Sequence, residues 1–127
     1  MQKKRERLLT ETELELMCIV WRLGQATVRE VRENLPEGRD ITYTSVAKIL
    51  SILEEKGALG SKKGEKTYLY YPRIAKEDYE SRALRHVTQG LFDGNPGSLV
   101  MRLLDGTDLS REDLAEIRKT IEARLDP

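Results

Sequence analysis

The stretch with the clearest chemical character runs from Thr42 to Gly57, with the sequence TYTSVAKILSILEEKG. At helical spacing its outer face carries short, hydroxyl-bearing or basic side chains in the first turns, and acids only in the last turn. The candidate contact residues of this stretch are Thr42, Tyr43, Thr44, Ser45, Lys48 and Ser51, with Ala47 between them. Hydroxyls, a lysine and the free N–H groups of a first helical turn are groups that hold phosphate. This surface therefore predicts contact with a polyanion, although an ordinary amphipathic core helix could show the same pattern.

A second basic group follows directly after this helix. The chain changes to an extended pattern in 58–62 and 67–71, rich in strand-forming residues, around the turn Lys63-Gly64-Glu65-Lys66, and Pro72 ends the second strand. This pattern predicts a β-hairpin whose tip carries Lys62, Lys63 and Lys66. The lysines could belong to a solvated loop, but their position beside the polar helix favours contact with a phosphate backbone.

Two capping boxes predict the helices that support these surfaces. Thr10 with Glu13 begins a helix that Gly24 ends. Its predicted inner face is Leu14, Met17, Cys18 and Trp21. Thr27 with Glu30 begins a shorter helix. Its predicted inner face is Val28, Val31 and Leu35, and that of the third helix is Val46, Ile49, Leu50 and Leu53. Three short helices and a basic hairpin predict a mainly α fold with a winged helix-turn-helix domain, whose third helix enters the major groove of DNA.

The remaining residues predict three further amphipathic helices. The first spans 75–92 and has a thin apolar line, Ser98 is expected to cap a short apolar helix, and Ser110 is expected to cap the last one. Segments this small cannot bury so much apolar surface alone, so we expect pairing with a second copy of the chain. The residues expected at that dimer interface are Leu91, Leu99, Val100, Leu103, Leu104, Leu114, Ile117 and Ile121.

Composition sets wider limits on function. The 127 residues carry 22 Lys and Arg against 22 Asp and Glu, so a basic surface must arise locally, and the cluster Lys3–Arg7 could either touch phosphate or keep the chain soluble. The single Cys18 excludes an intrachain disulfide and argues against structural zinc, and His86 is expected at the surface. No phosphate loop, nucleophile elbow or metal-binding pair is present, which predicts no enzyme activity, no cofactor and no metal. With no signal peptide and no apolar run of about 20 residues, we expect a cytoplasmic protein without membrane insertion.

The order of these motifs resembles the penicillinase repressor family, the BlaI/MecI/CopY group of bacterial transcriptional regulators. The likeness is carried by LTETELELMCIVWRLG, TVREVRENLP, TYTSVAKILSILEEKGALGSKKGEKTYLYYP, GSLVMRLL and LSREDLAEIRKTIE, which together span most of the chain. It implies a homodimeric repressor of palindromic promoter sites, with a winged helix-turn-helix domain in 1–73 and a helical dimerisation domain in 74–127. In such a dimer the half-sites lie about 34 Å apart, or a multiple of it.

Departures from the family pattern limit what the resemblance implies. Many members carry Lys or Arg where this chain has Thr44, Ala47 and Ile52, so we expect a different base preference. In antibiotic-responsive members a membrane sensor protease triggers cleavage between an Asn and a Phe. The matching positions here are Arg102 and Leu103, so the protease is a candidate partner but release by cleavage is left open. The cysteine cluster of the copper-responsive branch is absent. The alternative is a winged-helix module that binds protein partners and not DNA.

Overall fold

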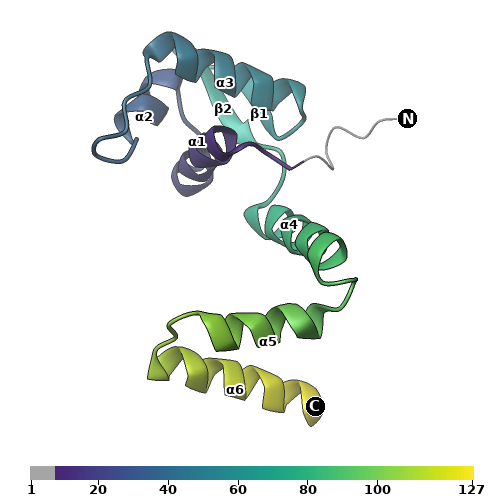
Figure 1. Cartoon of the computed structure of the whole chain (residues 1–127). Coiled ribbons are helices and arrows are strands. Elements are labelled where there is room, and N and C mark those ends of the chain that lie inside the picture. The colour runs from purple at the N-terminus through teal and green to yellow at the C-terminus, as the bar shows by residue number, and fades with distance from the viewer. Residues whose placement is uncertain (1–7) are drawn as a thin grey trace. The chain divides into compact units, whose positions relative to one another are not determined.

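The computed structural model describes residues 8–127, and the basic cluster Lys3–Arg7 lies outside the described residues. The elements in chain order are α1 (Glu11–Leu23), α2 (Val28–Glu33), α3 (Tyr43–Glu55), β1 (Leu59–Lys63), β2 (Tyr68–Pro72), α4 (Lys76–Leu91), α5 (Pro96–Gly106) and α6 (Arg111–Leu125) (Figure 1). The prediction of a mainly α chain with a small β-hairpin is therefore confirmed. The chain divides into two compact units, one ending at Ala83 and the other running from Leu84 to Pro127.

The core of the first unit lies among α1, α2, α3 and the start of the hairpin. Its largest fully buried side chains are Leu16, Met17, Val20, Val31, Val46, Leu50, Leu53 and Leu59. The predicted inner faces of α2 and α3 are confirmed, with Leu35 and Ile49 partly buried at the edge of this core. Fully burying one such aliphatic side chain contributes about 1.5–3 kcal/mol, so this core fixes which face of α3 is left to solvent.

The first helix turns a different face inward from the one that its spacing predicted. Of the predicted set only Met17 is fully buried, and the core is completed by Leu16, Ile19 and Val20. Leu14, Cys18 and Trp21 are only partly buried. The segment LELMCIVWRL is apolar on more than one side, so its periodicity alone does not select the face that packs inward.

Trp21 packs at the edge of the core against the segment that leads into α4. Its indole Nε1–H donates to the carbonyl oxygen of Ile74 at 2.9 Å, and its ring centroid lies 5.9 Å from that of Tyr79. The Tyr79 side chain is only 8% exposed, and its hydroxyl accepts a hydrogen bond from the backbone N–H of Leu9 at 3.0 Å. The first turns of α4 therefore pack with the first unit.

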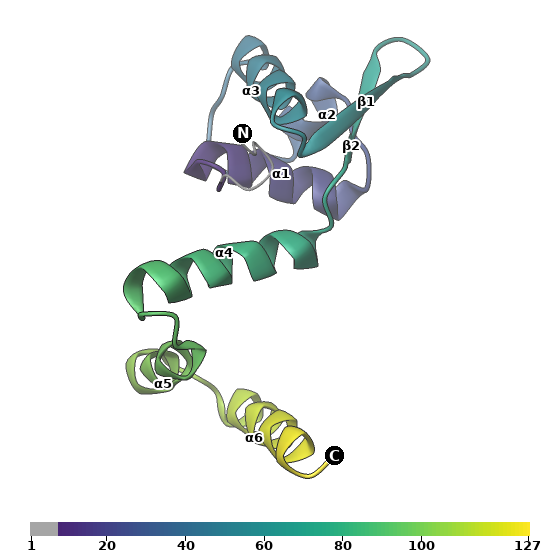
Figure 2. The same ribbon diagram turned by 90° about the vertical axis from the view of Figure 1, so that its right-hand side faces the viewer.

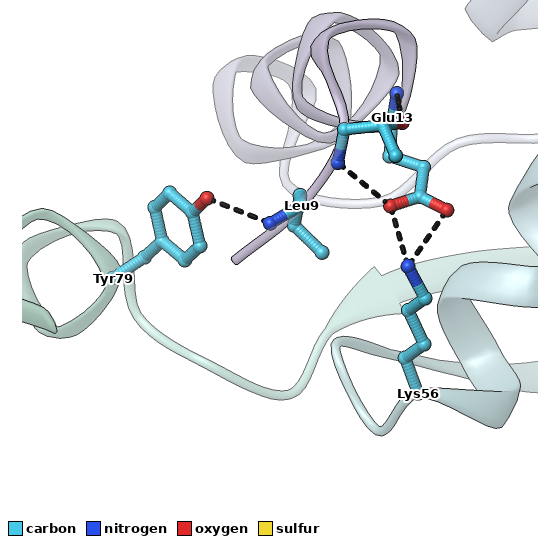
Figure 3. A network of polar contacts seen from close by, with 5 residues as sticks. Leu9, Glu13, Lys56 and Tyr79 are labelled. Carbon is cyan, nitrogen blue, oxygen red and sulfur yellow. Dashed lines mark hydrogen bonds and ion pairs between the residues drawn. The ribbon is translucent and has the colours of Figure 1, made fainter. Parts of the chain in front are cut away.

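Both predicted capping boxes are present. The Thr10 hydroxyl accepts from the Glu13 N–H, and the Glu13 carboxylate accepts from the Thr10 N–H at 3.0 Å; Thr27 and Glu30 repeat the pattern. The Glu13 carboxylate also receives Lys56 Nζ at 2.7 and 2.9 Å, which ties α1 to the residue that caps α3 (Figure 3). Burial raises the pKa of Glu13, but the hydrogen bonds and charge of Lys56 and the Thr10 N–H outweigh it, so the net pKa is lowered.

The hairpin is a two-stranded antiparallel sheet. Leu59 pairs with Pro72 at its base, and Lys63 pairs with Tyr68 at its tip. Each strand begins and ends one residue later in the chain than predicted. The loop between α1 and α2 adds a single bridge, because the N–H and C=O groups of Ala26 both pair with Tyr70, at 2.9 and 2.8 Å. This bridge holds the base of the hairpin against the helices.

The second unit begins within α4 and continues through α5 and α6. The cap of α5 is Asn95 and not the predicted Ser98: the Asn95 side chain accepts from the Ser98 N–H, and Pro96 occupies the first turn, where its missing N–H costs nothing. Ser110 caps α6 as predicted. No residue from 89 to 127 is buried. Among the described residues no helix combines the length and apolar character that crossing a bilayer requires.

Candidate nucleic-acid interface

The outer face of α3 is open to solvent. Every predicted contact residue of this stretch is exposed, namely Thr42, Tyr43, Thr44, Ser45, Lys48 and Ser51. Ala47, placed on the same face by spacing, is partly buried against the core. The buried residues Val46, Leu50 and Leu53 hold the opposite side of the helix. Hydroxyls and one lysine therefore form a continuous surface whose orientation is set by the core beneath it.

The two hydroxyls at the start of α3 differ in what they can still bind. The Thr42 hydroxyl accepts from the Ser45 N–H at 3.2 Å and donates to Ser45 Oγ at 3.0 Å, so its one proton is already used. Ser45 Oγ keeps its own proton and can donate it to a phosphate oxygen. Thr42 thus positions the helix end, whereas Ser45 is free to contact an anion.

The N-terminal end of α3 is electrostatically distinct from those of the two preceding helices. The first turn of α1 contains Glu11 and Glu13 and that of α2 contains Glu30, whereas the first turn of α3 contains no acid. An acid there would repel phosphate, and its absence leaves the positive end of the helix dipole uncompensated. The charge pattern makes this helix end the one of the three that is suited to an anion.

Two arginines fix the loop that leads into α3. Arg32 donates from Nε to the carbonyl oxygen of Ile41 at 2.9 Å, directly before the cap of α3. Arg39 pairs with Glu15 on α1 at 3.0 Å. Both cations are engaged in holding this loop, so the rather long turn between α2 and α3 has a defined path.

The hairpin projects past the three helices (Figure 2), and its two faces differ. Cross-strand partners share a face, and successive residues of one strand point to opposite faces. Leu59 is fully buried, and Ser61 on the same face donates from Oγ to the Glu54 carboxylate of α3 at 2.7 Å. This α3 side of the hairpin therefore includes Ser61, Lys63, Tyr68 and Tyr70. Burial and the nearby groups Glu54 and Tyr43 raise the pKa of Tyr70.

The predicted trio of wing lysines is split by this alternation. Lys62, Lys63 and Lys66 are all exposed, but Lys62 lies on the face opposite Lys63. The Lys62 ammonium lies 6.0 Å from the ring centroid of Tyr71, on that opposite face. Tyr68 was predicted only as a strand-forming residue of the hairpin. Its pairing with Lys63 places it on the α3 side, and strand propensity alone does not indicate that side.

Comparison with known proteins agrees with this architecture. The family model described as "Penicillinase repressor" matches residues 9–123. The methicillin resistance regulatory protein MecI of Mammaliicoccus sciuri is 23% identical over 116 residues, covering 91% of this chain and 94% of that protein. The penicillinase repressor of Bacillus licheniformis is 25% identical over 114 residues, covering 90% and 89%.

A solved structure extends the likeness to three dimensions. The DNA-binding domain of the repressor BlaI superposes with a TM-score of 0.50 at 28% identity, covering 56% of this chain and 87% of that domain. The fold of the first unit is thus that of a winged-helix domain, and the resemblance inferred from the sequence motifs is confirmed. With a family match over nearly its whole length, this chain belongs to the penicillinase repressor family, a family of transcriptional repressors.

Proposed function

We propose that this chain is a sequence-specific DNA-binding transcriptional repressor that acts as a homodimer on palindromic promoter sites. The observation that carries the proposal is the exposed hydroxyl-and-lysine face of α3, with its acid-free first turn, beside a basic hairpin. Family membership and the likeness to a repressor's DNA-binding domain support the same assignment. Occupying a promoter would exclude the polymerase.

In this assignment α3 lies in the major groove and supplies sequence preference. Thr44 and Lys48 reach base edges, with Lys48 suited to a guanine or a phosphate. Tyr43, whose side chain is 48% exposed, packs on a sugar or a thymine methyl group. Ser45 and Ser51 donate to phosphate or base oxygens, while Thr42 holds the cap.

The hairpin acts as the wing and contacts the backbone beside the groove. Its lysines supply charge for phosphate oxygens, which adds affinity without reading sequence. Lys63 shares the side of the hairpin that meets α3, and Lys66 lies in the turn at its tip. Lys62 faces the other way and is expected to contribute least.

The second unit is proposed to hold two such domains together. Large apolar side chains are exposed along α4, α5 and α6, which is costly for a monomer and ordinary for a surface covered by a second copy. The exposed fractions include 73% at Leu91, 48% at Leu103 and 45% at Ile121. A two-fold dimer through these helices would match the symmetry of a palindromic operator.

A duplex-binding titration at two salt concentrations tests this function. DNA binding predicts a steep loss of affinity with salt, with a slope of about 0.9 for each phosphate contact. Replacing Lys63 with Gln should lower that slope by about 0.9, the equivalent of one phosphate contact, on all sequences alike. Replacing Thr44 or Lys48 should instead change which promoter sequence is preferred. If the chain bound no duplex at low salt and recovered no promoter fragment in a genome-wide pull-down, the proposal would fail and the protein-interaction module would be favoured.

A further inference from the structure

Tyr68 is a large aromatic residue at the projecting end of the wing. It is the first residue of β2, at the tip end of the hairpin, and its side chain is 57% exposed. A single exposed aromatic residue is common on protein surfaces and indicates little by itself. Here, however, the ring lies on the projecting part of the wing, directly opposite Lys63 in the pairing register. An aromatic plane between basic groups has the chemistry of a nucleic-acid contact.

The side on which the ring lies is set by the strand register. Tyr68 shares its face with Ser61 and Tyr70, and Ser61 is hydrogen-bonded to Glu54 of α3. Tyr70 packs against the core, and both its backbone N–H and its backbone C=O are hydrogen-bonded to Ala26. The base of this face is therefore anchored, and its free upper part continues from α3 toward the tip of the wing. A duplex held by α3 would meet Tyr68 and Lys63 before it met the opposite face.

The hairpin turn gives this face little freedom. The Gly64 N–H donates to the Thr67 carbonyl oxygen at 2.8 Å, directly before Tyr68. A Cβ at Gly64 would stand 2.6 Å from that oxygen, so the turn closes more tightly than a side chain there would allow. The backbone at the start of β2 is thus held by a tight turn, so Tyr68 is carried on a defined part of the wing.

The opposite face has different chemistry. The Tyr71 ring lies against Gly60, where an added Cβ would be 2.6 Å from ring atoms, and Lys62 is placed over that ring at 6.0 Å. Its aromatic and basic groups face each other and not the surface shared with α3. The two faces thus offer the same residue types. On the Tyr68 face, however, the described structure shows no cation–π contact between Lys63 and the Tyr68 ring, so both groups remain available to a ligand.

We propose that Tyr68 is a DNA-contact residue of the wing, whose ring packs on a deoxyribose of the backbone beside the half-site while Lys63 holds an adjoining phosphate. This inference rests on the proposed function and assigns a one-sided contact to the wing. The hydroxyl of Tyr68 is not required, because the contact is made by the ring. Lys62 lies outside it.

Four variants of the full chain test the assignment against a promoter duplex that the wild-type chain selects in a genome-wide pull-down. Tyr68→Ala should weaken binding by about tenfold, because it removes the apolar area that the ring buries against the sugar, and Tyr68→Phe should stay close to wild type. Lys63→Gln should flatten the salt dependence by about 0.9 in slope, whereas Lys62→Gln, the same change one residue away on the other face, should leave it nearly unchanged. Thermal unfolding followed by Trp21 fluorescence should be unaltered in all four.

The outcomes separate this inference from the function on which it rests. If the wild-type chain bound no duplex in a salt-dependent manner, the proposed function itself would fail. If it bound well but Tyr68→Ala had wild-type affinity, only the Tyr68 contact would be overturned. Equal effects of Lys62→Gln and Lys63→Gln would overturn the one-sided wing, and a Phe variant as weak as the Ala variant would overturn packing through the ring.

Discussion

At the scale of single residues, the pair between Glu13 and Lys56 is the ion pair of the described residues that we expect to contribute most to stability. Their side chains are only 10% and 22% exposed, and the carboxylate also closes the capping box of α1 (Figure 3). Replacing Glu13 with Gln leaves a half-buried ammonium poorly paired, so we expect a loss of about 1–3 kcal/mol in the free energy of unfolding at pH 7. Urea unfolding followed by the fluorescence of Trp21, which lies in the same unit, measures it.

The pH dependence of this effect has a defined sign. Because the pKa of Glu13 is lower in the folded protein than in the unfolded chain, its contribution is present above the unfolded value and is lost as pH falls through the folded value. The difference between wild type and Glu13→Gln should therefore shrink below about pH 4. The control is Glu33→Gln, which removes an exposed pair with Arg29 and should cost about 0.5 kcal/mol or less. Equal costs for the two variants would show that the Glu13 pair is no stronger than a surface pair.

The chemical character of the site could be predicted from residue types, but its exact geometry could not. The exposed hydroxyls and Lys48 follow from helical spacing once the core face of α3 is known, and that face was unambiguous. The wing lysines were grouped by their closeness in sequence, although Lys62 and Lys63 are neighbours in one strand and must lie on opposite faces. Which of the two faces meets α3 is set by tertiary packing, which the strand pattern alone does not give.

At the scale of elements, local signals predicted where helices begin better than which way they face. The caps Thr10, Thr27 and Ser110 were predicted because a hydroxyl followed by an acid is a local pattern. The inner face of α1 was not, since several of its sides are apolar and tertiary packing decides among them. At α5 the predicted cap Ser98 was wrong: Asn95 caps the helix, and Pro96 after it fits the first turn.

The glycine that ends α3 supports a prediction at this scale. Gly57 has φ of 85°, a conformation that costs other residues about 1–2 kcal/mol, and the first residues of the wing depend on that turn. Gly57→Ala should therefore destabilise the protein by about 1 kcal/mol. Gly90→Ala, the same change inside α4 with nothing within 4 Å of the added methyl group, should instead stabilise by about 0.5 kcal/mol. Thermal unfolding by circular dichroism gives both signs, and a shift in the same direction for both would contradict the role assigned to Gly57.

At the scale of the whole molecule, the exposed apolar residues of α4 to α6 support a prediction about assembly. If a second copy covers them, Leu103→Glu places a carboxylate in an apolar interface and should weaken association by about 3 kcal/mol or more, which is roughly a hundredfold. Light scattering at micromolar concentration should then give the dimer mass for wild type and the monomer mass for the variant. Leu23→Glu, the same change at an exposed leucine in α1, is the matched control and should remain dimeric.

The Leu103 variant should keep its Trp21 fluorescence and its weak binding to a half-site, and lose the added affinity of a full palindrome, because only the link between two intact domains is broken. A wild-type chain that is monomeric at these concentrations would refute the dimer while leaving the winged-helix surface untouched.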